Sequence, residues 1–236
     1  MHYLLTILLL LLSLQSSAQM RTYVVPVLHG LHRTNDAYNY DSLRTLIGKL
    51  QPDLILVEMR SEDMEADTAY LKQNYPYEMW MVRYWFPETR LAGFDWLGEE
   101  LEGRPVPAGY WKDSSSIKKL QRQLTGDSAI AKLKKPCDAI QEMRKETLRT
   151  GSLKSIINRD PHFVVAYYDC LIEAYVGTDY QPLHRFYEKR NKRLTSNIRD
   201  LLKNNRAKRI LILTGADHYP YIYKGLLAAG YRLDPV

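Results

Sequence analysis

Polar residues that can do chemistry lie at or just beyond the ends of four apolar runs of the sequence. The candidates are His29 at the end of the first run and His32 after it, Glu58 at the end of the second, Asp95 near the end of the third and His218 after the fourth. Neutral imidazoles and carboxylates are ligands for Zn, Mn or Co ions, and a metal with an open position activates bound water. The same groups can act without a metal, with Glu58 as general base and a histidine as acid or oxyanion partner.

The four runs have the composition of strands in a parallel sheet. They cover residues 22–29, 53–58, 90–96 and 209–215. The second and fourth are continuously apolar, which is typical of strands buried on both faces. Ligands of such sheets bind outside the carboxyl ends of the strands. We therefore expect the candidate residues to meet in one crevice, although up to 189 positions separate them (218 − 29).

Helical patterns surround these strands. Apolar spacing predicts a helix over residues 41–50 with Asp41 as its N-cap, and a short helix over 221–229. A last strand is expected over 231–235. The fold class is thus α/β, with a mainly parallel central sheet flanked by helices.

The middle of the chain, residues 114–204, reads as a helical insertion. Helices are predicted over residues 116–124, 137–148, 162–175 and 183–202, with Pro161, Gly177 and Pro182 as breaks. Basic residues there alternate with glutamates and apolar positions at helical spacing. This is typical of a solvated helix face, so no nucleic-acid partner is expected.

Composition bounds the class of protein. The chain has 236 residues, of which 45% are hydrophobic and 25% charged, and its formal net charge is +6. These values exclude collagen-like, low-complexity and largely disordered chains. No Gly/Ser/Pro-rich linker divides the sequence, so a single domain is expected over residues 19–236.

The N-terminus reads as a secretory signal. Residues 3–14 are almost wholly apolar but too few to span a bilayer as a helix. Ser16 and Ala18 supply small residues for cleavage after Ala18, giving a signal peptide over residues 1–18 and a periplasmic or secreted protein without a transmembrane span in its mature chain. An uncleaved anchor is the alternative. In an oxidising compartment Cys137 and Cys170 either form a disulfide or remain buried thiols.

Four short motifs occur in a fixed order. They are a G-x-x-H-like element ending at His32, a P-D-x-x-x-x-E element ending at Glu58, an Arg-Asn pair at Arg190 and Asn191, and G-x-x-H from Gly215 to His218. This order resembles the Tiki/TraB superfamily (TraB/GumN-like), which includes erythromycin esterase-like and ChaN-like proteins. The first motif has glycine where this chain has His29. The esterase-like branch has glutamate there, so a polar residue fits.

The resemblance implies an α/β domain with its site at the strand carboxyl ends. Activities found within the superfamily include metal-dependent proteolysis, ester hydrolysis and haem binding. We therefore expect an exported hydrolase acting on peptide or small-molecule substrates, with His29, His32, Glu58 and His218 as metal ligands and Glu58, Asp95 and Arg190 as catalytic residues. Arg190 is expected to stabilise an anionic intermediate. The alternatives are a non-catalytic protein that binds haem or another small ligand, and an interaction protein with an inactive site.

Overall fold

The computed structural model describes residues 20–236. The predicted signal peptide lies outside these residues. The sheet consists of β1 (Arg21–Val27), β2 (Leu54–Val57), β3 (Arg90–Gly93) and β4 (Arg209–Gly215). All pairings are parallel and the order is β1-β4-β2-β3, so the last strand lies between the first two. The predicted α/β class with a parallel sheet is confirmed.

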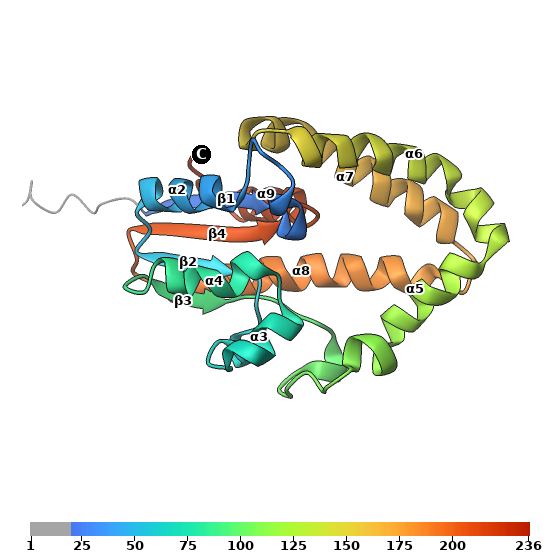
Figure 1. Ribbon diagram of the computed structural model, residues 1–236, viewed down its shortest axis with the longest axis horizontal. Helices are drawn as coiled ribbons and strands as arrows, with labels where there is room; N and C mark the ends of the chain where they lie inside the picture. The colour runs from blue at the N-terminus through green and yellow to red at the C-terminus, as the bar shows by residue number, and fades with distance from the viewer. Residues whose placement is uncertain (1–19) are drawn as a thin grey trace, which may run out of the picture.

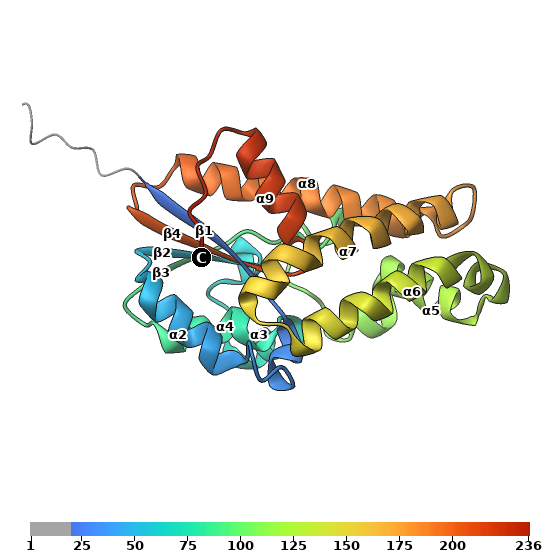
Figure 2. The ribbon, with the colours of Figure 1, turned by 90° about the horizontal axis from the view of Figure 1, so that it is seen from above.

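Helices cover both faces of the sheet. One face packs on α2 (Tyr40–Leu50) and α4 (Tyr77–Trp85), through side chains such as Leu43, Ile47 and Val82. The other face packs on α8 (Gln181–Lys203) and α9 (Tyr219–Ala228). Figure 2 shows α8 and α9 on one side of the strands and α2 and α4 on the other. Both faces of the inner strands β2 and β4 are therefore buried, which explains their continuous apolar runs.

The helical insertion forms an arm beyond the carboxyl ends of the strands. It contains α5 (Ser116–Gly126), α6 (Ser128–Thr150) and α7 (Leu153–Tyr175), and α8 returns from it to the sheet (Figure 1). Pro161 lies inside α7 and does not end it, contrary to prediction. A disulfide joins Cys137 of α6 to Cys170 of α7, which settles the alternative left open by the sequence.

Two local predictions were wrong. Asn39, rather than Asp41, caps α2, and its side chain accepts a hydrogen bond from the Ser42 N–H. Residues 231–235 form no strand. Instead the Asp234 N–H donates to the Thr22 carbonyl at 2.8 Å, and the Asp234 carboxylate accepts from the Thr22 N–H. These two bonds tie the tail to the start of β1 without extending the sheet.

Short elements fill the connections. They are η1 (His29–Arg33), η2 (Ser61–Asp63), α3 (Thr68–Asn74), η3 (Glu99–Leu101) and η4 (Tyr110–Ser114). Across residues 20–236, no helix combines the length and apolarity needed to cross a bilayer.

Candidate functional site

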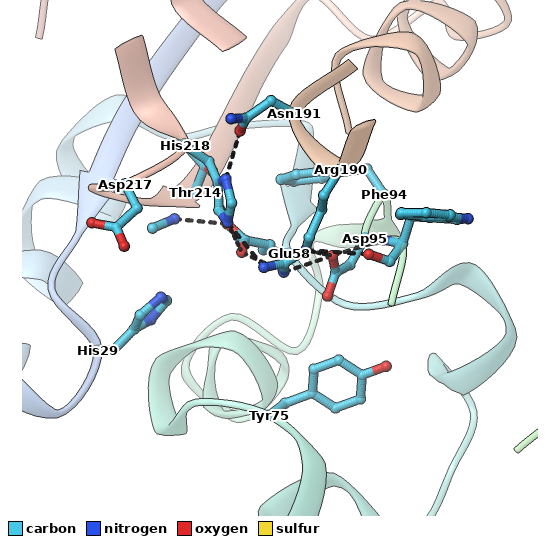
Figure 3. Close-up of polar contacts among 12 residues, drawn as sticks. His29, Glu58, Tyr75, Phe94, Asp95, Arg190, Asn191, Thr214, Asp217 and His218 are labelled. Carbon is cyan, nitrogen blue, oxygen red and sulfur yellow. Dashed lines mark hydrogen bonds and ion pairs between the residues drawn. The ribbon is translucent and has the colours of Figure 1, made fainter. Parts of the chain in front are cut away.

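The strand register brings the predicted residues to one edge. Val27 pairs with Gly215, and Val57 pairs with both Leu213 and Gly93. The residues that follow these positions therefore leave the sheet at the same level. His29, Glu58, Asp95, Asp217 and His218 lie around this edge, with Arg190 entering from α8 (Figure 3).

Glu58 is held as an ionised carboxylate. Its side chain is 5% exposed and accepts hydrogen bonds from the Gly215 N–H and Thr214 hydroxyl, both at 2.8 Å, and from Arg190 Nη2 at 3.0 Å. Burial tends to raise the pKa of Glu58, but its neighbours His218 and Arg190 lower it on balance to about 2.

His218 is held as a neutral imidazole. Its Nδ1–H donates to Asn191 Oδ1 at 2.6 Å, and its Nε2 accepts from Arg190 Nη1 at 3.0 Å. Burial lowers its pKa to about 4. The Arg190–Asn191 pair thus fixes one tautomer and orients the ring.

Asp95 completes the surroundings of Arg190. Its Oδ1 accepts from Arg190 Nη2 at 2.8 Å and from Nε at 3.1 Å. Burial raises the pKa of Asp95, an effect that Arg190 opposes. Arg190 therefore links the three residues that follow β2, β3 and β4. Arg60, which follows Glu58 by two positions, pairs with Asp63.

His29 forms a second histidine–carboxylate pair. Its Nδ1–H donates to Glu78 Oε1 at 2.7 Å, and the Glu78 side chain is fully buried in α4. Burial lowers the pKa of His29, but the hydrogen bond and charge of Glu78 raise it on balance above the ordinary 6.5. Because Nδ1 carries the bonded proton, Nε2 of the neutral ring keeps a lone pair. The side chain is 39% exposed and lines a cavity, so the ring is accessible to a ligand.

The backbone at His29 is left-handed. Its φ is +51°, in the region that favours glycine, which costs a non-glycine residue roughly 1–2 kcal/mol. A glycine at this position would adopt the same conformation without that cost. Strain of this kind persists where the side chain has a role. On the opposite side, a Cβ added to Gly215 would lie 2.6 Å from His29 Nε2, so only glycine leaves room for the ring.

His32 does not join the other candidates. Its ring is fully buried, with Nε2 accepting from the Leu28 N–H at 2.9 Å and Nδ1–H donating to the Tyr38 carbonyl at 2.6 Å. Both nitrogens are thus used by the backbone. The structure gives His32 the role of fixing the turn that presents His29.

A charged network fastens the arm to this edge. Arg144 of α6 donates from Nε to Asp160 of α7 at 2.8 Å, and its Nη2 lies 2.5 Å from the Asp217 carboxylate. Tyr187 donates to the Asp217 carbonyl at 2.6 Å and stacks between Tyr168 and His218. The arm therefore forms one wall of the site.

The site opens into a cavity of about 710 Å³. Its walls include His29, Glu58, Asp95, Arg190, Asp217 and His218, together with α6 residues of the arm. The cavity is of a size that holds a small organic ligand.

The predicted metal ligands are engaged in hydrogen bonds. Both Glu58 oxygens and His218 Nε2 accept them, and Arg190 lies where a cation would meet these atoms. Within residues 20–236, no three His, Cys, Asp or Glu side chains form a metal-binding group. As the side chains lie, Arg190 supplies the positive charge beside Glu58 and His218.

Comparison of the chain with protein-family models, curated proteins and solved structures yields no match. The resemblance to the Tiki/TraB superfamily therefore stays a prediction from the motifs.

The sequence did not single out Glu78. It is the one carboxylate in the aromatic and apolar segment Tyr77–Trp85, and a charged residue in such a segment is a candidate for a buried partner. Arg144 and Asp160 were hidden among many charged residues of the arm. Only the fold shows that both are buried.

Proposed function

We propose that the chain is a hydrolase of ester or peptide bonds, with His29 as general base. The observation that carries this proposal is the buried Glu78 carboxylate bonded to His29 Nδ1, at a ring that lines the cavity and whose Nε2 adjoins Gly215. A histidine that is oriented by a carboxylate and lines a ligand cavity is an arrangement suited to proton transfer.

In this mechanism neutral His29 removes a proton from water. The water oxygen bonds to the carbonyl carbon of the substrate while the carbonyl π electrons move to oxygen. The tetrahedral intermediate then collapses, the bond to the leaving oxygen or nitrogen breaks, and the His29 imidazolium returns the proton to the leaving group. Glu78 stabilises the transient imidazolium and keeps the proton on Nδ1 throughout.

Arg190 is the candidate for stabilising the oxyanion. A guanidinium has five N–H donors, and the bonds to Asp95, Glu58, His218 and the Trp96 carbonyl leave one Nη1 hydrogen without an acceptor among the described residues. Glu58 and Asp95 then act as anchors that hold the guanidinium in place. Preorganised donors of this kind contribute strongly to acyl-transfer catalysis.

No step of this mechanism requires a metal, because Arg190 supplies the positive charge at the site. The prediction of Zn, Mn or Co bound by His29, His32, Glu58 and His218 remains open to a direct test with chelator. The haem-binding alternative likewise awaits a titration, in which a Soret band lost on His218→Ala would support it.

We also propose that the protein acts outside the cytoplasm. The Cys137–Cys170 disulfide supports this, since such bonds persist in oxidising compartments.

The proposed function is tested with p-nitrophenyl acetate and a fluorogenic peptide library, with and without EDTA. We expect turnover that EDTA leaves unchanged and that Glu58→Gln reduces at least tenfold, because the variant loosens Arg190. Glu88→Gln, at an exposed site, is the matched control. Loss of turnover with EDTA and recovery with Zn²⁺ would establish the metal-dependent mechanism instead. Equal rates for wild type, Glu58→Gln and buffer would reject a hydrolase.

A further inference from the structure

We propose that the substrate is an amphiphile with an apolar limb and an anionic limb, bound in two cavities on either side of Arg190. This inference rests on the proposed function, since it places the scissile bond where the two limbs meet. The first cavity is the one of about 710 Å³ described above. The second, of about 520 Å³, lies under the arm and is called the arm cavity below.

The two cavities adjoin at the site. Both are lined by Leu97, Trp111, Arg190, Asp217 and His218. A ligand that occupies both would therefore lie alongside Arg190. His29 lines only the first cavity, so a water activated there approaches the junction from that side.

The arm cavity suits an apolar limb. Many of its lining side chains are aromatic or aliphatic, among them Ile117 and Leu124 of α5, Tyr167 and Leu171 of α7, and Phe186 of α8. Glu100, Lys118 and Lys134 also line it, and Lys134 is paired with Asp138. Aromatic side chains offer a large apolar contact area at low cost in conformational entropy. Such walls favour alkyl or aryl groups over charged ones because burial of apolar area is the main source of affinity.

The first cavity suits an anionic limb. Each of its three carboxylates has an arginine partner: Glu58 and Asp95 share Arg190, at 3.0 and 2.8 Å, and Asp217 lies 2.5 Å from Arg144. Lys145 and Arg149 of α6 line the same cavity.

These two basic side chains are available to a ligand. Among residues 20–236, Lys145 pairs with Glu142 alone, at 2.6 Å, in a contact where both side chains are about half exposed, and such pairs contribute little. Arg149 forms no ion pair within the same residues and is exposed. The α6 side of this cavity therefore offers two basic side chains to a carboxylate or phosphate.

The inference is tested by calorimetric titration with three probes below their micellar concentrations: dodecanoate, dodecyltrimethylammonium and acetate. Dodecanoate has both limbs and cannot be hydrolysed, so its binding is independent of turnover. We expect its Kd to be at least tenfold below those of the other two.

Variants assign each limb to its cavity. Lys145→Glu with Arg149→Glu should weaken dodecanoate binding at least tenfold, whereas Lys154→Glu with Arg159→Glu, an equal change of charge at exposed sites of α7, should leave it within twofold. Tyr167→Ala and Ile117→Gln should each weaken it at least threefold. Tyr84→Ala, which removes an exposed tyrosine outside both cavities, should not.

Equal Kd values for dodecanoate and dodecyltrimethylammonium, or no binding of dodecanoate, would overturn the inference. Ester hydrolysis combined with either result would support the hydrolase proposal and reject only the substrate class. Selective binding of dodecanoate without hydrolysis of any ester would reject the hydrolase proposal and support a binding site for anionic amphiphiles.

Discussion

His29 Nδ1 lies 2.7 Å from the Glu78 carboxylate, and this pair joins the turn after β1 to α4. The carboxylate is fully buried while the histidine ring is partly exposed. The acidic partner is thus shielded from water, whereas the histidine ring lines the cavity. The proposed mechanism depends on this asymmetry.

Glu78→Gln should shift the pH dependence of hydrolysis. Activity requires neutral His29, so kcat/KM rises with pH through a His29 pKa that lies above 6.5. Without the carboxylate this pKa falls, and the rising limb should move to lower pH while the plateau rate drops. A pH–rate profile measures both. If the rising part of the pH–rate profile of Glu78→Gln lies at the same pH as in the wild type, His29 is not the titrating base.

Glu58→Gln should destabilise the fold in a pH-dependent way. The pKa of Glu58 is lowered from 4.5 to about 2 on folding, so its contribution is full above pH 4.5 and is lost as the pH falls toward 2. The expected loss of unfolding free energy at pH 7 is about 1–3 kcal/mol, as for a buried charged hydrogen bond. Urea titrations at pH 7 and pH 3 should show the difference narrowing on acidification; a constant difference would contradict this account.

Gly215→Ala should reduce hydrolysis more than stability. The added methyl group would lie 2.6 Å from His29 Nε2, so the ring must turn away from the cavity. We expect kcat to fall at least tenfold. Gly126→Ala, where the same methyl group meets no atom within 4 Å, is the matched control. Activity at the wild-type level in Gly215→Ala would mean that the position of His29 is not required.

His32→Ala should weaken the fold without removing the chemistry. It deletes two buried hydrogen bonds to the Leu28 and Tyr38 backbone, and each backbone group left unpaired costs about 1–3 kcal/mol. A lower Tm with retained kcat well below that temperature is expected. Complete loss of kcat in a folded His32→Ala variant would show that His32 is needed for the reaction.

The strands and their carboxylates were predictable because parallel strands bury both faces and end at one edge. Continuous apolar runs locate β2 and β4, and Glu58 and His218 follow from their positions. The roles of the histidines were not predictable. His29 and His32 are three residues apart in one motif, yet the backbone turn buries one and exposes the other.

Glu78 and the arm contacts required the fold itself. Glu78 is 49 positions from His29, and no local pattern links the two residues. The Asp217–Arg144 contact likewise depends on how the arm folds back over the sheet edge. Tertiary packing brings these charges together. The apolar spacing that predicts a helix does not predict which charged residues of different helices will meet.

The most direct test of the central claim is the kcat/KM of His29→Asn. Asparagine tolerates the left-handed backbone at this position, so the turn is preserved while the base is removed. His162→Asn, at an exposed position of α7, is the control. The account predicts a loss of at least 100-fold for His29→Asn and none for His162→Asn. Equal activity of the two folded variants would contradict it.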